Sequence, residues 1–188
     1  MSAPPDVPNI VARAFDVSRR RGFVSFCRNE TGRLLAMLSA TRTGTMAEFG
    51  TGTGVGTAWL RSGMRPGTRI LTAELDPKLA VAAAEIFTED ERVEVVAADW
   101  STLRDRGPFS LLFLDAREPE SSGPDTVADL VEPAAIVVLD DFTPCASWPP
   151  VHGGRVDTLR EQWLVDPRFT TAEVMVAADT SVLIATRR

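Results

Sequence analysis

The stretch MAEFGTGTGVGTAWL, residues 46–60, decides how the rest of the chain is interpreted. Glu48 stands just before four glycines that occupy every second position, and a helix-like run follows them. Glycine at such a turn lets the backbone approach a ligand closely, because it has no Cβ atom. The loop alone is compatible with a phosphate, a dinucleotide or another ligand. The glycines are Gly50, Gly52, Gly54 and Gly56.

Length and composition predict one soluble globular domain. The chain has 188 residues, of which 44% are hydrophobic and 24% charged, and its net charge is −6. A net negative charge opposes binding to long nucleic acid. The longest apolar run, 134–139, is far shorter than the roughly 20 residues that cross a bilayer, and residues 1–15 lack the pattern of a secretory signal. Two distant cysteines, Cys27 and Cys145, indicate reduced thiols in a cytoplasmic protein. Either could be a catalytic thiol, but both are interpreted as small buried hydrophobic residues.

Outward from the loop, apolar runs alternate with helical patterns. Such alternation predicts a doubly wound α/β fold with a parallel sheet, and a tight turn near Asp179 and Thr180 predicts a closing antiparallel hairpin. The expected fold is therefore a mostly parallel seven-stranded sheet with a C-terminal antiparallel hairpin, in a single domain over 23–188 that follows a polar, proline-rich segment 1–22. The predicted strands are 45–50, 67–75, 92–99, 109–116, 133–141 and two within 169–188. The predicted helices are 55–64, 76–89, 125–132 and 154–166, preceded by one within 23–41.

Each of the first five predicted strands ends in acid. In doubly wound sheets ligands bind at the carboxyl ends of the strands, so these side chains are expected to share one edge. The acids are Glu48, Glu74 with Asp76, Asp99, Asp115, and Asp140 with Asp141.

The acids and the glycine spacing argue against a phosphate ligand. A Walker loop needs a lysine and a hydroxyl residue after its last glycine, whereas Thr57 and Ala58 follow Gly56. A dinucleotide fingerprint would need a glycine at Val55 or Thr57. A cationic ligand with a ribose suits the site better, and Glu74 is placed to accept hydrogen bonds from ribose hydroxyls. S-adenosylmethionine, with a sulfonium, an ammonium and a ribose, meets these requirements.

The segments ETGRLLAMLSATRTGTMAEFGTGTGVGTAWL (30–60), TAELDPKLA (72–80), AADW (97–100), LLFLDA (111–116) and VVLDDFTP (137–144) carry a family resemblance. The chain resembles the class I S-adenosylmethionine-dependent methyltransferases, and among them the catechol and caffeoyl-CoA O-methyltransferase family. The resemblance runs from about residue 30 to residue 188. It implies O-methylation of a small-molecule acceptor and allows a homodimer.

By that resemblance, the cofactor is held along one edge of the sheet. Glu48 supports the loop, the backbone around Gly50 to Gly54 approaches the methionine part, and Glu74 binds the ribose. Asp99 accepts from the adenine amino group, and Leu75 and Trp100 sandwich the ring. Thr51, Thr57 and Asp115 complete the implied cofactor-binding set. The place of Asp115 in this set, near the sulfonium, is an alternative to binding a metal ion.

The same family places a divalent ion on three side chains, and Asp115, Asp140 and Asp141 stand at the matching positions. Three hard oxygen ligands suit Mg²⁺, Mn²⁺ or Ca²⁺. Such an ion would lower the pKa of the acceptor hydroxyl, which gives Asp115 a catalytic role. The sequence departs from the family at Asp141, where asparagine is usual, and at Glu118, where the family has a lysine.

Other interpretations stay open for function and for the acceptor. A methyltransferase that needs no metal, a protein that binds S-adenosylmethionine without turnover, and a nicotinamide-dependent oxidoreductase are the alternatives, the last disfavoured by the glycine spacing. His152, the only histidine, is a candidate general base because its ordinary pKa lies near neutrality, or else an exposed loop residue. Trp148, with the prolines that follow it, is a candidate wall of the acceptor pocket.

Overall fold

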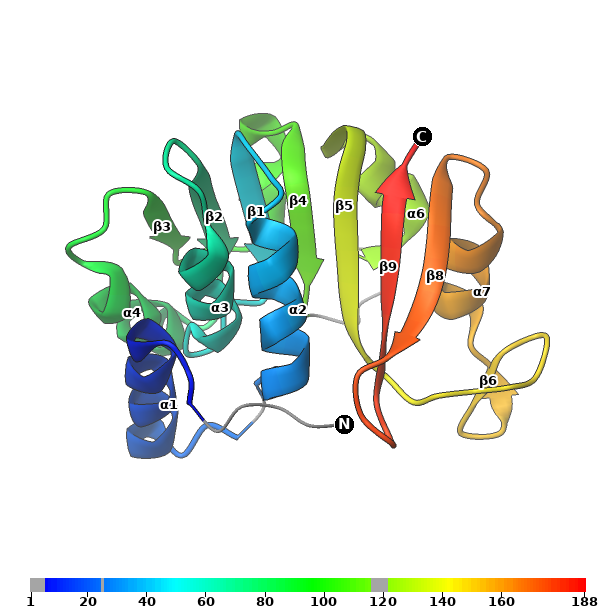
Figure 1. Ribbon diagram of the computed structural model, residues 1–188, viewed down its shortest axis with the longest axis horizontal. Helices are drawn as coiled ribbons and strands as arrows, with labels where there is room; N and C mark the ends of the chain where they lie inside the picture. Colours follow the sequence, from blue (N-terminus) through cyan, green and yellow to red (C-terminus); the bar gives the residue numbers. More distant parts are fainter. Residues whose placement is uncertain (1–5, 25, 116–121) are drawn as a thin grey trace.

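The computed structural model describes residues 6–24, 26–115 and 122–188. Its centre is a seven-stranded sheet with the strand order β3-β2-β1-β4-β5-β9-β8, seen from left to right in Figure 1. The first five of these strands run parallel, and β9 pairs antiparallel with both β5 and β8. The predicted fold class is confirmed. The strands are β1 (Thr45–Phe49), β2 (Arg69–Ala73), β3 (Val93–Val96), β4 (Phe109–Leu114), β5 (Val131–Phe142), β8 (Phe169–Met175) and β9 (Ser181–Arg187).

The strand order reverses between β1 and β4. The chain moves from β1 outward through β2 to β3, and then returns to the other side of β1 to build β4 and β5. Ligands of doubly wound sheets bind at this reversal, outside the carboxyl ends of the strands. The segments that follow β1, β2, β4 and β5 are therefore the ones that form the candidate site.

Two helical layers cover the sheet, and each encloses its own part of the core. Side chains of α1, α2, α3 and α4 pack with Met46, Ile70 and Phe113 on one face. Side chains of η1, α6 and α7 pack with Phe49 and Leu112 on the other. The period of two along a strand sends neighbouring residues to opposite faces. The helices are α1 (Asn9–Arg21), α2 (Asn29–Ser39), α3 (Val55–Gly63), α4 (Pro77–Phe87), the 3₁₀ helix η1 (Trp100–Arg106), α6 (Pro124–Ala128) and α7 (Thr158–Val165).

Helix α1 lies in the segment for which the sequence analysis predicts no helix. Val11, Ala14 and Val17 are buried and belong to the same core as α2 and α3. Their spacing of three residues is typical of one helix face, so a signal was present beneath the polar composition. Gly22, with φ of +64°, ends the helix, as glycine commonly does.

Other element boundaries differ from the predicted ones by a few residues. β5 begins at Val131, which pairs with Phe109, and so the helix predicted over 125–132 spans only Pro124–Ala128. Ala134, with φ of +62°, lies between the two paired parts of β5, where the register shifts. A small hairpin that was not predicted, β6 (Val151–His152) with β7 (Arg155–Val156), turns at Gly153 and Gly154. Among the described helices, none has the length and apolar character that a membrane span requires.

Candidate functional site

The glycine loop leaves β1 at the reversal of strand order. The backbone N–H groups of Gly50 and Thr51 donate to the carbonyl of Ala73 at 3.1 and 3.2 Å, which anchors the start of the loop on β2. Gly50, Gly52 and Gly54 have φ of +93°, +54° and +87°. Residues with a side chain rarely adopt this left-handed region. The glycines are thus required by the backbone conformation of the loop.

Gly56 lies in the first turn of α3, and the packing around it leaves no room for a side chain. A Cβ atom at this position would lie 2.2 Å from Oε1 of Glu48 and 2.8 Å from the ring of Phe113. Glycine therefore lets the first turn of α3 approach β1 and β4 directly. The close approach fixes the position of the buried Glu48 carboxyl group.

Glu48 is completely buried between β1 and α3. Its Oε2 accepts hydrogen bonds from the hydroxyls of Thr57 and Thr72, the second at 2.7 Å. Burial raises the pKa of Glu48 to about 7, although the threonine hydroxyls lower it in part. Within the described part of the chain, Oε1 has no hydrogen-bond partner. The site thus contains a carboxyl group that is poised between its neutral and charged forms near pH 7.

Glu74 connects the end of β2 to the glycine loop. Its Oε2 accepts from the backbone N–H of Gly52 at 2.7 Å, and its Oε1 accepts from the N–H of Asp76 at 2.9 Å. The hydroxyls of Thr51 and Thr72 are also hydrogen-bonded to each other. The loop is therefore held by two side chains at the end of β2, Thr72 and Glu74, and the carboxylate of Glu74 keeps further lone pairs available.

Asp115 follows β4 and brings a further carboxyl group to the same edge. Its N–H donates to the carbonyl of Phe49 at 3.1 Å, which continues the ladder between β1 and β4. Burial raises the pKa of Asp115 well above its ordinary value, and the negative charges of Glu48, Asp140, Asp141 and Glu74 raise it further. Like charges in one site disfavour ionisation unless a cation is present. These carboxyl groups therefore favour the binding of a positively charged ligand at this edge of the sheet.

The three aspartates of the predicted metal site do not form a metal-binding group in this arrangement. Asp140 is almost fully buried, and its Oδ1 accepts from the N–H of Asp141 at 2.8 Å and from the hydroxyl of Thr31 at 3.3 Å. Burial raises the pKa of Asp140 to about 6. Asp141 is exposed and has φ of +64°. Residues 6–24, 26–115 and 122–188 contain no group of three His, Cys, Asp or Glu side chains that could hold a metal ion.

Glu118 falls outside the described residues.

The residues predicted to hold an adenine lie at the ends of β2 and β3. Asp99 is exposed and caps η1, because its Oδ1 accepts from the N–H of Ser101 at 2.9 Å. Trp100 packs against Phe49, with ring centroids 5.1 Å apart, and Cζ of Arg104 lies 5.0 Å from the centroid of the Trp100 ring. The side chain of Leu75 is 72% exposed. Leu75 and Trp100 thus follow neighbouring strands of the sheet, and neither side chain is fully buried.

His152 lies on β6 rather than at the reversal of strand order. It is exposed and pairs with Arg155 across the small hairpin. Figure 1 shows β6 beyond the β8 edge of the sheet, well separated from β1 and β4. Trp148, 63% exposed, belongs to the same loop region. The general base predicted at His152 thus stands apart from the carboxyl groups of the site.

Several residues that contact the site were not predicted to do so. The ring of Phe23 lies 3.0 Å from where a Cβ of Gly52 would be, and the hydroxyls of Ser18 and Thr53 are hydrogen-bonded to each other. Cys27 is buried, as predicted, and the charges of Asp115, Asp140 and Glu48 act on its sulfur. These contacts join the segment after α1 to the glycine loop. No local pattern marks them, because they depend on where α1 packs.

Comparison with known proteins identifies a curated relative of similar sequence and several solved structures of similar fold. No family model matches the chain. Over 120 residues, covering 60% of this chain, it is 32% identical to the catechol O-methyltransferase of Mycobacterium tuberculosis. The aligned segment spans 54% of that relative, so the chain covers about half of its length.

Solved structures share the fold at low sequence identity. An O-methyltransferase from Bacillus cereus in complex with SAH has a TM-score of 0.77 at 19% identity, with 98% of this chain and 93% of that chain covered. The O-methyltransferase TomG from Streptomyces achromogenes in complex with SAM has a TM-score of 0.78 at 21% identity, with 97% and 92% covered. Cofactor-bound Rv0187 from MTB has a TM-score of 0.77 at 21% identity, with 100% and 99% covered. The architecture is the Rossmann-like methyltransferase fold.

Proposed function

We propose that this chain is a class I O-methyltransferase that uses S-adenosylmethionine to methylate a hydroxyl group of a small molecule. The fold and the partial similarity to a catechol O-methyltransferase support this assignment. The observation that carries the proposal is the set of carboxyl groups around Asp115. Glu48, Glu74, Asp140 and Asp141 all raise the pKa of Asp115. A cation relieves this repulsion, and S-adenosylmethionine carries both a sulfonium and an ammonium group.

The residues of the edge suit the parts of this cofactor. The glycines hold the loop in a left-handed conformation that a residue with a side chain would find strained, and we assign this loop to the methionine part. Glu74 has a carboxylate with lone pairs left for ribose hydroxyls beyond its bonds to Gly52 and Asp76. Trp100 and Leu75 offer apolar surface for the adenine ring, and Asp99 offers an exposed acceptor. We assign these residues to the cofactor on that basis.

When bound, S-adenosylmethionine supplies an electrophilic methyl group. The chain's contribution is to orient the donor and the acceptor hydroxyl, which removes most of the entropic cost of bringing them together. The acidic edge stabilises the positive charge of the donor, and the segment after α1, through Phe23, covers the glycine loop. The hydroxyl proton has to leave during the transfer. We place Asp115 next to the reacting groups, because burial and the surrounding acids raise its pKa well above the ordinary value of an aspartate.

The proposal assigns no step to a metal ion. Among the described residues, Asp115, Asp140 and Asp141 do not form a group that could hold one. A metal-assisted reaction would require these carboxylates to rearrange. Transfer measured with EDTA, and then with added Mg²⁺, Mn²⁺ or Ca²⁺, separates the two cases. A cytoplasmic homodimer stays a prediction, for which light scattering can measure the assembly.

Calorimetric titration with S-adenosylmethionine tests the cofactor assignment. We expect binding by the wild-type chain and a strong loss of affinity in Glu74→Gln, which keeps the shape of the side chain but weakens its acceptors. Glu85→Gln, at an exposed position on α4, removes the same charge and serves as the matched control. The proposal is overturned if the wild-type chain shows no binding with or without divalent ions.

Turnover distinguishes an enzyme from a protein that only binds the cofactor. Catechol is a suitable first acceptor, because the curated relative is a catechol O-methyltransferase. The assay follows formation of S-adenosylhomocysteine by mass spectrometry, first with catechol and then with other phenols and aliphatic alcohols. Binding without turnover on any of these hydroxyl compounds would contradict the assignment as an O-methyltransferase and favour a binding protein or another acceptor atom.

A further inference from the structure

The end of β5 contains an irregularity that lies directly at the acidic edge. Asp140 and Asp141 together face a single residue of β9, so the strand has a β-bulge at this point. A bulge bends a strand and changes the direction of its side chains. Asp141 has φ of +64°, a left-handed conformation that is unfavourable for a residue with a side chain. The paired residues on either side of the bulge are Leu139 with Leu183 and Phe142 with Ser181.

The bulge reverses the alternation of side chains along β5. Leu139 and Phe142 are separated by an odd number of positions, which in a regular strand sends them to opposite faces of the sheet. Both nevertheless belong to the core on the face that α7 covers. Asp140, between them, is almost fully buried, and its Oδ1 accepts from the hydroxyl of Thr31, on α2. The bulge therefore directs Asp140 toward α2 and Phe142 toward α7.

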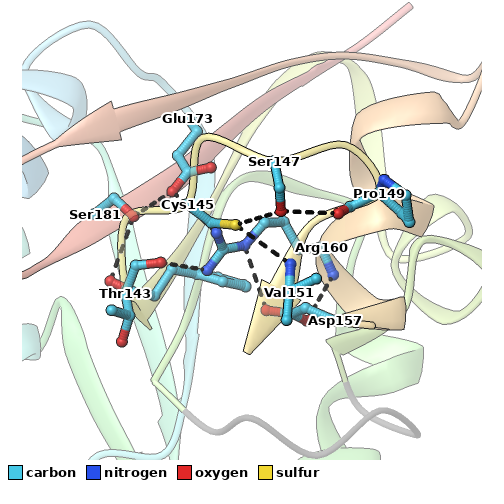
Figure 2. Close-up of polar contacts among 10 residues, drawn as sticks. Thr143, Cys145, Ser147, Pro149, Val151, Asp157, Arg160, Glu173 and Ser181 are labelled. Carbon is cyan, nitrogen blue, oxygen red and sulfur yellow. Dashed lines mark hydrogen bonds and ion pairs between the residues drawn. The ribbon is translucent and has the colours of Figure 1, made fainter. Parts of the chain in front are cut away.

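Arg160, on α7, holds the residues that follow the bulge (Figure 2). Its side chain is completely buried, Nη2 donates to the carbonyl of Thr143 at 2.7 Å, and Cζ lies 5.1 Å from the centroid of the Phe142 ring. Two carboxylates keep the guanidinium in place, since Nε lies 3.3 Å from Oδ2 of Asp157 and Nη1 lies 3.5 Å from Oε1 of Glu173. A planar guanidinium can make such contacts on several sides at once, which a lysine ammonium group cannot.

Ser181 connects the same residues to β9 and β8 (Figure 2). Its buried hydroxyl is placed to donate to the carbonyl of Phe142, at 3.3 Å, or to Oε1 of Glu173. Buried polar contacts thus join the chain after the bulge to α7, β8 and β9. Such networks favour one geometry, because any other arrangement leaves buried groups without partners. The left-handed conformation of Asp141 is therefore imposed by its surroundings.

The loop that follows does not offer comparable support. Residues 143–149 are exposed or half-buried. Cys145 is among them, so its interpretation as a buried hydrophobic residue is wrong. Exposed segments with few buried contacts are the ones that open first in a folded protein. The buried guanidinium of Arg160, rather than the loop, is what holds the end of β5.

We propose that Arg160 is a positioning residue for methyl transfer, because it fixes the bulge that carries Asp140 and Asp141 on the acceptor side of the site. The inference rests on the proposed function, which places the cofactor over the ends of β1 and β2 and Asp115 next to the reacting groups. Asp115 follows β4, and β5 is the next strand beyond it. The acceptor therefore approaches from the side of the bulge. Arg160 is itself completely buried and acts only through the bulge.

Methyl transfer by Arg160→Met and Arg160→Lys in the full-length chain separates positioning from stability. The acceptor is catechol, or the compound of the same hydroxyl panel that gives turnover. We expect kcat/KM for the acceptor to fall at least about tenfold in Arg160→Met, since small displacements at a reaction site lower the rate strongly. Arg160→Lys keeps one donor and should lose less. The Kd for S-adenosylmethionine, measured by calorimetry, should stay close to the wild-type value in both variants.

Arg187→Met is the matched control. Arg187, on β9, donates to the carbonyl of Val131 at 3.1 Å, at the opposite end of β5. This variant removes a similar contact between a guanidinium and a carbonyl, but one that lies far from the bulge. It should leave kcat/KM for the acceptor unchanged.

Hydrogen exchange followed by mass spectrometry tests the role of Arg160 without turnover. Peptides that cover 139–144 should exchange faster in Arg160→Lys than in wild type, whereas peptides that cover the glycine loop, 50–54, should keep the wild-type rate. Ser181→Ala leaves Arg160 in place and removes one contact with the carbonyl of Phe142. It should give a smaller increase over 139–144, and it provides the measurement if the Arg160 variants do not fold.

The outcomes separate this proposal from the proposed function. Unchanged exchange over 139–144, an unchanged kcat/KM in Arg160→Met, or an equal loss of kcat/KM in Arg187→Met would each overturn the proposal. A loss of affinity for S-adenosylmethionine as large as the loss of kcat/KM would also overturn it, because the whole site would then be disturbed. A wild-type chain without turnover on any hydroxyl compound contradicts the proposed function instead, and the exchange measurement then decides whether Arg160 holds the bulge.

Discussion

Replacing Glu48 by glutamine should remove a large part of the pH dependence of stability. The wild-type carboxyl group is fully buried and has a pKa of about 7, against 4.5 for an ordinary glutamate. Between these two values the folded state binds more protons than the unfolded state. The free energy of unfolding must therefore fall as the pH rises through this range.

The size of the effect follows from the difference in pKa. A shift from 4.5 to about 7 corresponds to about 3 kcal/mol of stability lost above pH 7. Glutamine mimics the protonated form and has no charge to bury, so this contribution is absent from Glu48→Gln. The variant should gain about 2.5 kcal/mol relative to wild type between pH 5 and pH 8. Asp115 and Asp140 contribute in the same direction in both proteins, because burial raises their pKa values too.

Urea unfolding at pH 5, 6, 7 and 8 measures this difference directly. The quantity to compare is the free energy of unfolding of Glu48→Gln minus that of wild type at each pH. Glu85→Gln, on the exposed surface of α4, controls for the loss of one negative charge. If the difference for Glu48→Gln stays constant with pH, the carboxyl group is not held in its neutral form by burial, and the reasoning fails.

Three other measurements test the packing and the charge of the site. Gly56→Ala should lower the free energy of unfolding by about 1–3 kcal/mol, because the new Cβ would lie 2.2 Å from Glu48 and 2.8 Å from Phe113. Urea titration measures the loss of stability, and an unchanged unfolding midpoint would contradict the close approach. Asp76→Ala should cost about 1 kcal/mol in the same assay, since Oδ1 of Asp76 caps α4 by accepting from the N–H of Lys78 at 2.8 Å. Affinity for S-adenosylmethionine, measured by calorimetry, should fall from pH 8 to pH 6. Glu48 and Asp140 have pKa values of about 7 and 6, so they become protonated over this range and lose their attraction for the cation. Equal affinities at both pH values would count against a cationic ligand at this edge.

The order of the elements was predictable because periodicity is local. Buried parallel strands appear as short apolar runs, and an amphipathic helix repeats its apolar residues every three or four positions. The acidic residues that follow the strands could also be identified from the sequence, and a doubly wound sheet places the carboxyl ends of its parallel strands at one edge. Boundaries were less accurate, as at Val131, because the pairing partner Phe109 lies far away in sequence.

The sequence by itself determined the fold class, the glycine loop after β1 and the acidic character of the edge, because each depends on a short pattern or on chain order. The tertiary structure decided how these residues are used. It turned Asp140 toward Thr31, placed Gly56 against Glu48 and brought Phe23 onto the glycine loop. These contacts join residues from different elements, and their geometry and the resulting pKa values depend on packing and burial, which no local stretch of sequence encodes.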